Sequence, residues 1–224
     1  MLDDATRWDI IHKKTQSDSQ TASNYAEEKE ALYPRAALVV ELGAGTGADA
    51  LYFLRRGHSV VALDISEFAL KQLKDYANKE NFSKKLVVRQ VDFGLHDMPI
   101  KDDSVDIVYS RISLNYFDAD HTTKIFKNVY RILKKGGKAY LTFKSPEDND
   151  EMQYLKSTAT VYEPNVYIDN GMLRSRFTQE QLQNMLSAAA ISTFEVKKYQ
   201  EDLSSRGDGH KSILYVHEVT FTKT

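Results

Sequence analysis

A glycine-rich turn between two apolar runs constrains the fold of this chain more than any other feature. The first run, Val39–Leu42, leads into Gly43–Gly47, where glycine stands at every second position, and a helical pattern begins at Ala48. The second run, Ser59–Leu63, ends at Asp64. Glycine has no Cβ atom, so a ligand can lie against the backbone at such a strand-to-helix turn. The feature predicts the opening strand, turn and helix of an α/β fold.

Acidic residues stand at the ends of both predicted strands. Glu41 comes two residues before the first glycine, and Asp64 follows the second strand. An acid about 20 residues beyond a glycine turn can accept hydrogen bonds from both hydroxyls of a ribose. The turn and its acids together predict a cofactor that contains a nucleoside.

Strands and helices continue to alternate as far as Phe143. Apolar runs predict strands at residues 38–42, 60–64, 86–91, 105–110 and 138–143. Between them lie a helix at 48–56 that Gly57 stops, a helix that Ser66 caps, and a helix that begins at Asp118 or Asp120 and ends at Gly136-Gly137. This alternation predicts a parallel sheet with helices on both faces.

The pattern changes after the fifth predicted strand. Residues 145–171 are polar, acidic and weakly periodic, which is typical of a solvated loop. Thr178-x-x-Gln181 is a capping box that opens a helix. Residues 194–199 and 213–221 then read as two strands without a helix between them, which predicts an antiparallel hairpin joined by the loop Ser204–Lys211.

A length of 224 residues suits one domain. We divide it into an N-terminal helical lid (1–36), a cofactor-binding core (37–144), a substrate-cap insertion (145–177) and a C-terminal helix with a hairpin (178–224).

Composition narrows the function classes. The chain has no cysteine, which excludes disulfides, zinc-thiolate sites and thiol nucleophiles. Its net charge of −2, with no clustered run of Lys and Arg, argues against nucleic acid as the main partner. The N-terminus has no apolar signal sequence, and no apolar stretch reaches the length of a membrane span. We therefore expect a cytoplasmic protein without a membrane contact, and the sequence leaves its oligomeric state open.

Taken in order, these motifs resemble those of class I S-adenosylmethionine-dependent methyltransferases, the broad group that includes many small-molecule methyltransferases. The resemblance covers residues 38–143 and is carried by Glu41–Gly47, Asp64, Asp92-Phe93, Asp106–Ser110 and Leu133–Gly137. It implies a single doubly wound, Rossmann-like α/β domain. The sheet would have seven strands in the order 3-2-1-4-5-7-6, with the seventh strand antiparallel and helices on both faces.

The resemblance also implies S-adenosyl-L-methionine as the cofactor and gives roles by position. Gly43, Gly45 and Gly47, with Ala44 between them, would pass under the methionine and the ribose. Asp64 would accept the ribose hydroxyls, Ile65 would pack on the adenine, and Ser110 would lie near the methionyl arm. Asp92 would accept from the adenine amino group, Phe93 would donate its backbone N–H to the ring, and Glu41 would orient the turn or the cofactor's amino group.

Some alternatives stay open at this point. Asp92 can instead cap a turn, and Phe93 can belong to the core. Gly43-x-Gly45-x-x-Ala48 also fits a variant of the dinucleotide fingerprint, so a nicotinamide-dependent oxidoreductase is the alternative class of enzyme. The chain offers no second domain to hold a hydride acceptor, which favours the methyltransferase interpretation.

Ligands bind at the carboxyl ends of the strands in open α/β sheets, so we expect the methyl acceptor there. The residues expected to contact it follow the fourth strand, lie in the insertion, or lie on the lead-in helix: Arg111, Asn115, Tyr116, Arg174, Arg176 and Trp8. Arg111 can hold an anion or pair with an acid of the protein, and Trp8 can be a packing residue. No catalytic residue is assigned, because methyl transfer needs a general base only for a protonated acceptor.

The acceptor itself is expected to be a small molecule. Ser110–Ser113 stand where amino-group DNA and RNA methyltransferases carry an Asn/Asp-Pro-Pro-aromatic turn. A protein or RNA acceptor remains the alternative. Asp118-x-Asp120-His121 resembles a metal-ligand cluster, but a capped helix start explains it better, and no metal is expected.

Overall fold

A seven-stranded sheet forms the centre of the molecule in the computed structural model, which describes residues 3–15, 20–202 and 213–224. Its strand order is β3-β2-β1-β4-β5-β10-β9, and only β10 runs antiparallel to its neighbours. The strands are β1 (Leu38–Leu42), β2 (Ser59–Asp64), β3 (Leu86–Gln90), β4 (Val105–Ser110), β5 (Leu133–Lys144), β9 (Phe194–Asp202) and β10 (Ile213–Thr222). The order and the terminal hairpin predicted from the sequence are confirmed. The predicted loop at Ser204–Lys211 lies outside the described residues.

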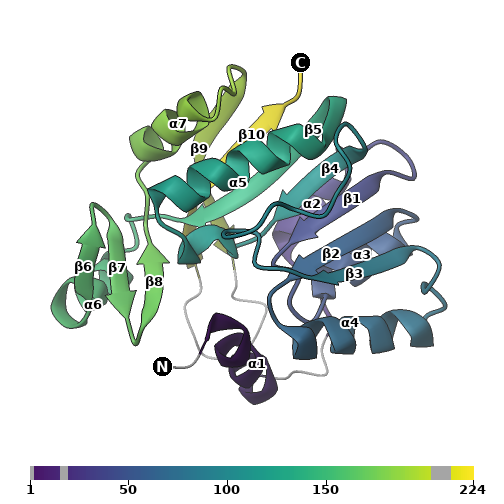
Figure 1. Ribbon diagram of the computed structural model, residues 1–224, viewed down its shortest axis with the longest axis horizontal. Helices are drawn as coiled ribbons and strands as arrows, with labels where there is room; N and C mark the ends of the chain where they lie inside the picture. Colours follow the sequence, from purple (N-terminus) through teal and green to yellow (C-terminus); the bar gives the residue numbers. More distant parts are fainter. Residues whose placement is uncertain (1–2, 16–19, 203–212) are drawn as a thin grey trace.

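Helices cover both faces of this sheet. Figure 1 shows α5 and α7 in front of the strands and α2 and α3 behind them. Each face has its own apolar core, one joining α5 and α7 to the sheet and the other joining α2, α3 and α4 to it. The helices are α2 (Asn24–Glu30), α3 (Ala48–Arg55), α4 (Glu67–Lys79), α5 (Ala119–Ile132) and α7 (Gln179–Ala188).

Short polar side chains begin these helices as the sequence predicts. The Ser66 hydroxyl accepts the N–H of Ala69, and Thr178 forms a complete capping box with Gln181. Asp118, and not Asp120, caps α5 by accepting the N–H of His121. The run that resembled a metal cluster is therefore a helix start, and the described residues contain no group of three His, Asp or Glu side chains placed to hold a metal.

The end of α5 differs from the prediction. The helix stops at Ile132, and β5 begins at once with Leu133, so Gly136 and Gly137 lie inside the strand. The pairing of β4 with β5 shifts register here, and Gly136 and Gly137 exchange backbone hydrogen bonds with Lys223 near the C-terminus. The two glycines therefore belong to an irregular strand and not to a helix end, because Lys223, far away in the sequence, supplies their hydrogen-bond partners.

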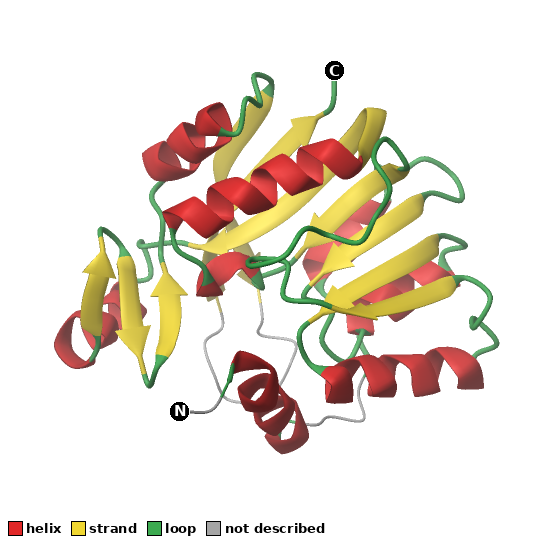
Figure 2. Ribbon diagram, in the orientation of Figure 1, coloured by secondary structure: helices red, strands yellow, loops and turns green. Residues whose placement is uncertain are grey.

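The insertion is not a loop. Residues 145–177 form α6 (Asn149–Thr158) and a separate antiparallel sheet of β6 (Thr160–Glu163), β7 (Val166–Asp169) and β8 (Met172–Ser175). Figure 2 shows this small sheet standing beside the main one. Its strands are only four residues long and follow a helix directly, so the sequence shows little periodicity.

The N-terminal 36 residues contain two helices of different kinds. The helix α1 (Asp4–Lys14) has no buried residue, whereas Tyr25 and Ala26 of α2 are fully buried. Only α1 is therefore free of the core and placed to act as a lid. In the part of the chain that the structure describes, no helix has the length and apolar character needed to cross a membrane.

Candidate functional site

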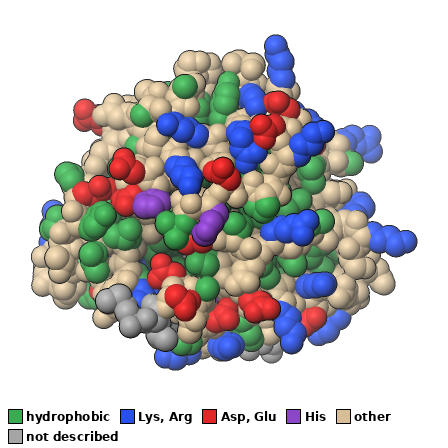
Figure 3. All heavy atoms as spheres, in the orientation of Figure 1, with side chains coloured by type: hydrophobic (Ala, Val, Ile, Leu, Met, Phe, Trp, Pro, Cys, Tyr) green, Lys and Arg blue, Asp and Glu red, His purple; other side chains and the backbone are tan. Residues whose placement is uncertain are grey.

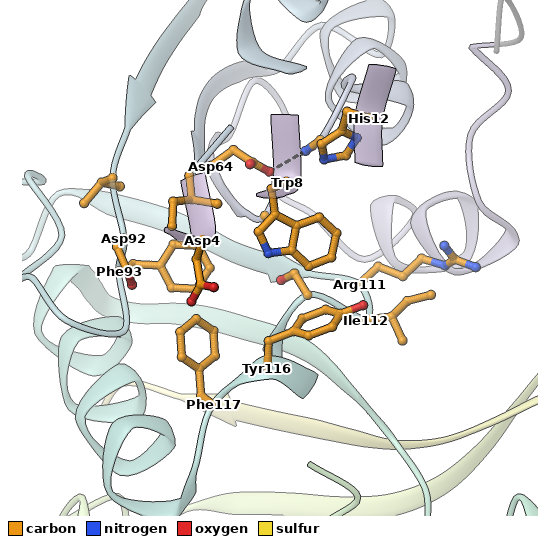
Figure 4. Close-up of a pocket in the computed structure, with 15 residues that line it drawn as sticks. Asp4, Trp8, His12, Asp64, Asp92, Phe93, Arg111, Ile112, Tyr116 and Phe117 are labelled. Carbon is orange, nitrogen blue, oxygen red and sulfur yellow. Dashed lines mark hydrogen bonds between the residues drawn. The ribbon is translucent and has the colours of Figure 1, made fainter. Parts of the chain in front are cut away.

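A cavity of about 240 Å³ opens at the carboxyl ends of β1, β2 and β4. Figure 4 shows its walls and the roof that α1 forms above it. Most of the residues expected to bind the cofactor meet here, although they come from segments far apart in the sequence. The lining comprises Asp4, Trp8, His12, Gly43, Gly45, Asp64, Ile65, Val91, Asp92, Phe93, Arg111, Ile112, Ser113, Tyr116 and Phe117.

The glycine turn forms the floor of the cavity, but not with all of its residues. Gly45 has a φ of +53°, and a Cβ atom there would lie 3.3 Å from Cε1 of His12 across the cavity. Gly47, with a φ of +89°, faces the other way, and its Cβ would overlap the side chain of Leu73 on α4. Ala44 is buried in the core beneath the turn. Gly47 and Ala44 therefore lie outside the cavity, because the turn must also pack on α4.

Asp64 is fixed at the end of β2 by two backbone groups. Its Oδ2 accepts the N–H of Gly45 at 2.8 Å, marked by the dashed line in Figure 4, and its Oδ1 accepts the N–H of Ser66 at 2.8 Å. Burial raises the pKa of the Asp64 carboxyl, while these hydrogen bonds and the nearby His12 act in the opposite direction. The carboxylate is thus held rigidly at the cavity wall.

Glu41 lies at the end of β1 and does not line the cavity. Its carboxyl is buried, and Oε2 has no hydrogen-bond partner among the described residues. Burial, and then the charges of Asp49 and Asp64, raise its pKa well above the usual value. Sequence reasoning missed Asp49, which accepts hydrogen bonds from Ser23 and from the hydroxyl of Tyr109. The sequence signal that could have identified Asp49 is its position in the first turn of α3, just after the glycine turn.

At the far end of the floor, Asp92 and Phe93 each have both of the roles that the sequence left open: a structural role and a place in the cavity lining. Oδ1 of Asp92 caps a turn by accepting the N–H groups of Gly94 and Leu95, yet the residue also lines the cavity. Phe93 belongs to the core and packs on Phe117 with a centroid distance of 5.5 Å, yet it too reaches the cavity wall.

Ser113, which the sequence did not single out, lines the cavity, whereas Ser110 does not. Ser110 is fully buried, and its hydroxyl lies 2.5 Å from that of Ser113 and donates to the carbonyl of Leu42. Ser113 lines the cavity directly beside Gly43. The strand β4 ends at Ser110, three residues before Ser113. Ser110 therefore lies behind the residue that lines the cavity and supports it.

Of the six residues expected on the acceptor side, Trp8, Arg111 and Tyr116 line the cavity. Trp8 and Tyr116 meet edge to face with centroids 4.7 Å apart. Arg111 is paired with Glu201, so the pairing with an acid of the protein, and not the capture of a free anion, is what the structure shows. The other three lie elsewhere.

Asn115 is buried and binds the backbone of Ile112 and Lys144. Arg176 is buried against Glu151. Arg174 lies over the Tyr116 ring at 5.2 Å, outside the lining. These three side chains support the wall of the cavity, because their partners come from β5, α6 and the small η1 turn (Leu114–Tyr116).

The roof comes from one face of α1. Asp4, Trp8 and His12 are spaced four residues apart, so they project from one side of the helix into the cavity. Sequence reasoning placed Trp8 and His12 together on the lead-in helix, counted only Trp8 among the acceptor-side residues and missed Asp4, although this spacing was visible. Asp9 fastens the helix to α4 by accepting from the Ser66 hydroxyl at 2.6 Å and the Phe68 N–H at 3.1 Å. Arg7 fastens it to the small sheet by donating to the carbonyl of Gly171 at 2.7 Å.

The sequence of this chain is similar to those of known methyltransferases. Residues 39–137 match a family model described as a methyltransferase domain. Malonyl-[acyl-carrier protein] O-methyltransferase of Pectobacterium atrosepticum is 28% identical over 99 residues, which are 44% of this chain and 35% of that protein. The chain spans less than half the length of the curated relatives that it matches.

Solved structures share the fold over nearly the whole chain. An S-adenosylmethionine-dependent methyltransferase from Methanosarcina mazei is 18% identical, with a TM-score of 0.68 over 88% of this chain and 98% of that one. The 1,6-didemethyltoxoflavin-N1-methyltransferase of Burkholderia thailandensis, solved with S-adenosylhomocysteine, is 16% identical, with a TM-score of 0.66 over 100% of this chain and 92% of that one. Residues 39–137 of the chain therefore match a methyltransferase domain, and the chain shares its fold with solved S-adenosylmethionine-dependent methyltransferases.

Proposed function

We propose that this protein transfers a methyl group from S-adenosylmethionine to a small-molecule acceptor in the cavity beneath α1. One observation carries the proposal: a single cavity joins the Gly45–Asp64 floor to Asp92 and Phe93 at one end and to Trp8 and Tyr116 at the other. The first four residues suit a nucleoside, and the last two leave room for a second molecule beside it.

The residues present fit the cofactor. Gly43 and Gly45 would carry the methionine and ribose, Asp64 would accept the ribose hydroxyls, and Asp92, Phe93 and Ile65 would hold the adenine. Glu41 is buried outside the cavity lining, with its Oε2 unpaired among the described residues, and would act by orienting the glycine turn. Ser113, which lines the cavity, would take the place beside the methionyl arm that was expected for Ser110. Gly47 and Ala44 would not line the cofactor site but would maintain the shape of the glycine turn.

The cofactor supplies a methyl group on a positively charged sulfur, and the electron pair of the broken carbon–sulfur bond stays on that sulfur. The chain's own residues would align the two reactants and exclude water. Such alignment can lower a barrier by roughly 7–11 kcal/mol in favourable cases. A cavity of about 240 Å³ is small for a cofactor with its acceptor, so α1 would move outward to admit them.

A cavity that α1 partly covers favours a small acceptor over a macromolecule. On the face drawn in Figure 3, basic and acidic side chains are interspersed, and no continuous basic surface crosses it. A nucleic-acid substrate would call for clustered Lys and Arg around the site. The nicotinamide alternative is not proposed, because the matching family model is a methyltransferase domain.

Calorimetric titration with S-adenosylhomocysteine, run beside NAD, tests the proposal. We expect S-adenosylhomocysteine to bind and NAD not to bind. Asp64→Ala should weaken binding by roughly 1.5–3 kcal/mol, the usual value of a hydrogen bond to a charged group. Asp120→Ala, which removes an exposed acid at the start of α5, is the matched control and should bind normally. Unchanged affinity in a folded Asp64→Ala protein would refute this placement of the cofactor.

A further inference from the structure

The acceptor end of the cavity carries an arginine that the protein itself neutralises. Nε of Arg111 donates to both oxygens of Glu201, at 3.1 and 2.8 Å, and a terminal nitrogen lies 2.8 Å from Oε2. The side chain of Glu201 is only 3% exposed and that of Arg111 only 14%. Figure 4 shows the guanidinium turned away from the rings of Trp8 and Tyr116. A two-pronged pair of this kind leaves Arg111 with little capacity to bind another anion.

The other arginine and lysine side chains described around this end, Arg174, Lys144 and Arg176, are also paired with acids. Arg174 lies 3.5 Å from Asp169 while its guanidinium covers one side of Tyr116. Farther back, Lys144 and Arg176 share one oxygen of Glu151, at 2.8 and 2.6 Å. An incoming carboxylate or phosphate would lose its water and meet no uncommitted cation among these residues, which is costly for a buried charge.

The acidic side chains of the cavity also disfavour an anionic acceptor. Asp64 stands at the floor and Asp4 at the roof, where Arg7 lies 3.4 Å from it. Asp4 is partly neutralised by Arg7, so Asp64 is the carboxylate that favours a positive sulfonium and repels an anionic acceptor. Three surfaces beside this end are the indole of Trp8, the ring of Tyr116 and the side chain of Ile112, which are largely apolar, and two of them are flat.

We propose that the acceptor is an uncharged aromatic molecule that packs on Trp8, and that Glu201 sets this selectivity by neutralising Arg111. The proposal rests on the proposed function and adds the class of acceptor to it. It also makes Glu201 a specificity-determining residue that no sequence motif marks, since it lies 90 residues from Arg111 along the chain.

The test uses two flat probes that differ by one charge, quinoline and quinoline-4-carboxylate, at neutral pH. Their affinities for the protein saturated with S-adenosylhomocysteine are measured by ligand-observed NMR. Quinoline should bind, and Trp8→Ala should abolish that binding. The carboxylate should bind about tenfold more weakly, because it lacks a partner for its charge. Tight, Trp8-dependent binding of the carboxylate to the wild type would overturn the proposal, as would no binding of quinoline.

Glu201→Gln sharpens the test, since it releases Arg111. This variant should bind the carboxylate about tenfold more tightly than the wild type does, with quinoline little changed. Glu195→Gln on the same strand, where the side chain is exposed, is the matched control and should change neither affinity. A folded Glu201→Gln protein that gains nothing for the carboxylate would refute the role of Glu201.

The wild-type comparison stands by itself if Glu201→Gln does not fold. Each titration begins from a measured S-adenosylhomocysteine complex. Loss of that complex would therefore be a failure of the proposed function, whereas the wrong order of probe affinities in an intact complex is a failure of this inference alone.

Discussion

At the scale of single residues, neighbours in the glycine turn have opposite tasks. Gly45 faces the cavity and His12, whereas Gly47 packs against Leu73. Both have positive φ angles, so any other residue would be strained at either position. The two glycines look alike in the sequence, and only their surroundings separate ligand binding from packing.

Replacing each glycine by alanine should separate these tasks. Gly45→Ala should weaken S-adenosylhomocysteine binding strongly and lower the free energy of unfolding by about 1–2 kcal/mol from strain. Gly47→Ala should cost more stability, because about 1–3 kcal/mol of overpacking against Leu73 adds to the strain. Urea unfolding and calorimetry measure the two effects. The assignment is wrong if Gly47→Ala is the more stable of the two variants.

At the scale of elements, α1 is attached to the molecule mainly by side-chain hydrogen bonds. None of its residues is buried, and Asp9 and Arg7 hold its two sides to α4 and to the turn between β7 and β8. Elements with few buried apolar contacts open at low free-energy cost. The small sheet of β6, β7 and β8, by contrast, has its own hydrogen bonds and should move less than α1.

Asp9→Ala should loosen α1. We expect faster hydrogen exchange in residues 4–14 and faster release of S-adenosylhomocysteine, because the contacts with Ser66 and Phe68 are lost. Trp8 is the only tryptophan, so its fluorescence reports the release in stopped flow. Glu67→Ala, an exposed acid in the first turn of α4, is the control. Unchanged exchange and release in Asp9→Ala would show that Asp9 does not hold the helix.

A second element-scale prediction concerns acid stability. Burial alone would raise the pKa of Glu151, but the hydrogen bond and charge of Arg176, together with Lys144, lower it from 4.5 to about 2. A carboxyl whose pKa is lowered on folding stabilises the protein above its unfolded pKa, and this contribution disappears as the pH falls. The stability advantage of wild type over Glu151→Gln should therefore be full above about pH 5 and shrink between pH 4.5 and 2. Urea unfolding at a series of pH values measures it, and a difference independent of pH would contradict the ion-pair explanation.

At the scale of the whole molecule, two cores on opposite faces of the sheet hold the fold together. Neither core includes a residue of α1, whereas α2 contributes Tyr25 and Ala26 to one of them. The lid predicted for residues 1–36 is thus divided, with α1 over the cavity and α2 in the core. Within the N-terminal segment, α1 covers the cavity, whereas α2 contributes to the core and so to stability.

Deleting residues 1–20 should leave a folded protein with a small loss of stability. The cavity would lose its roof of Asp4, Trp8 and His12, so affinity for S-adenosylhomocysteine should fall much more. Thermal unfolding and calorimetry compare the two losses. A truncated protein that binds normally would show that α1 is an ordinary surface helix, and one that does not fold would show that α1 stabilises the domain.

The sequence by itself determined the order of strands and helices around the main sheet, the helix caps and the glycine turn with its acids, but not the elements of the insertion. These depend on local patterns: apolar runs, a Ser, Thr or Asp before a helix, and glycine where φ is positive. The strand order was implied by the family resemblance that the motifs at Glu41–Gly47, Asp64 and Asp92 carry, and the sheet confirmed it.

Only the tertiary structure decided the features that depend on distant partners. Gly136-Gly137 lie in a strand because Lys223 binds them, and Ser113 replaces Ser110 at the wall because the chain turns after β4. Arg111 meets Glu201 across 90 positions. Such contacts arise when the sheet and its cores bring remote segments together, and no local pattern encodes which side chains then meet.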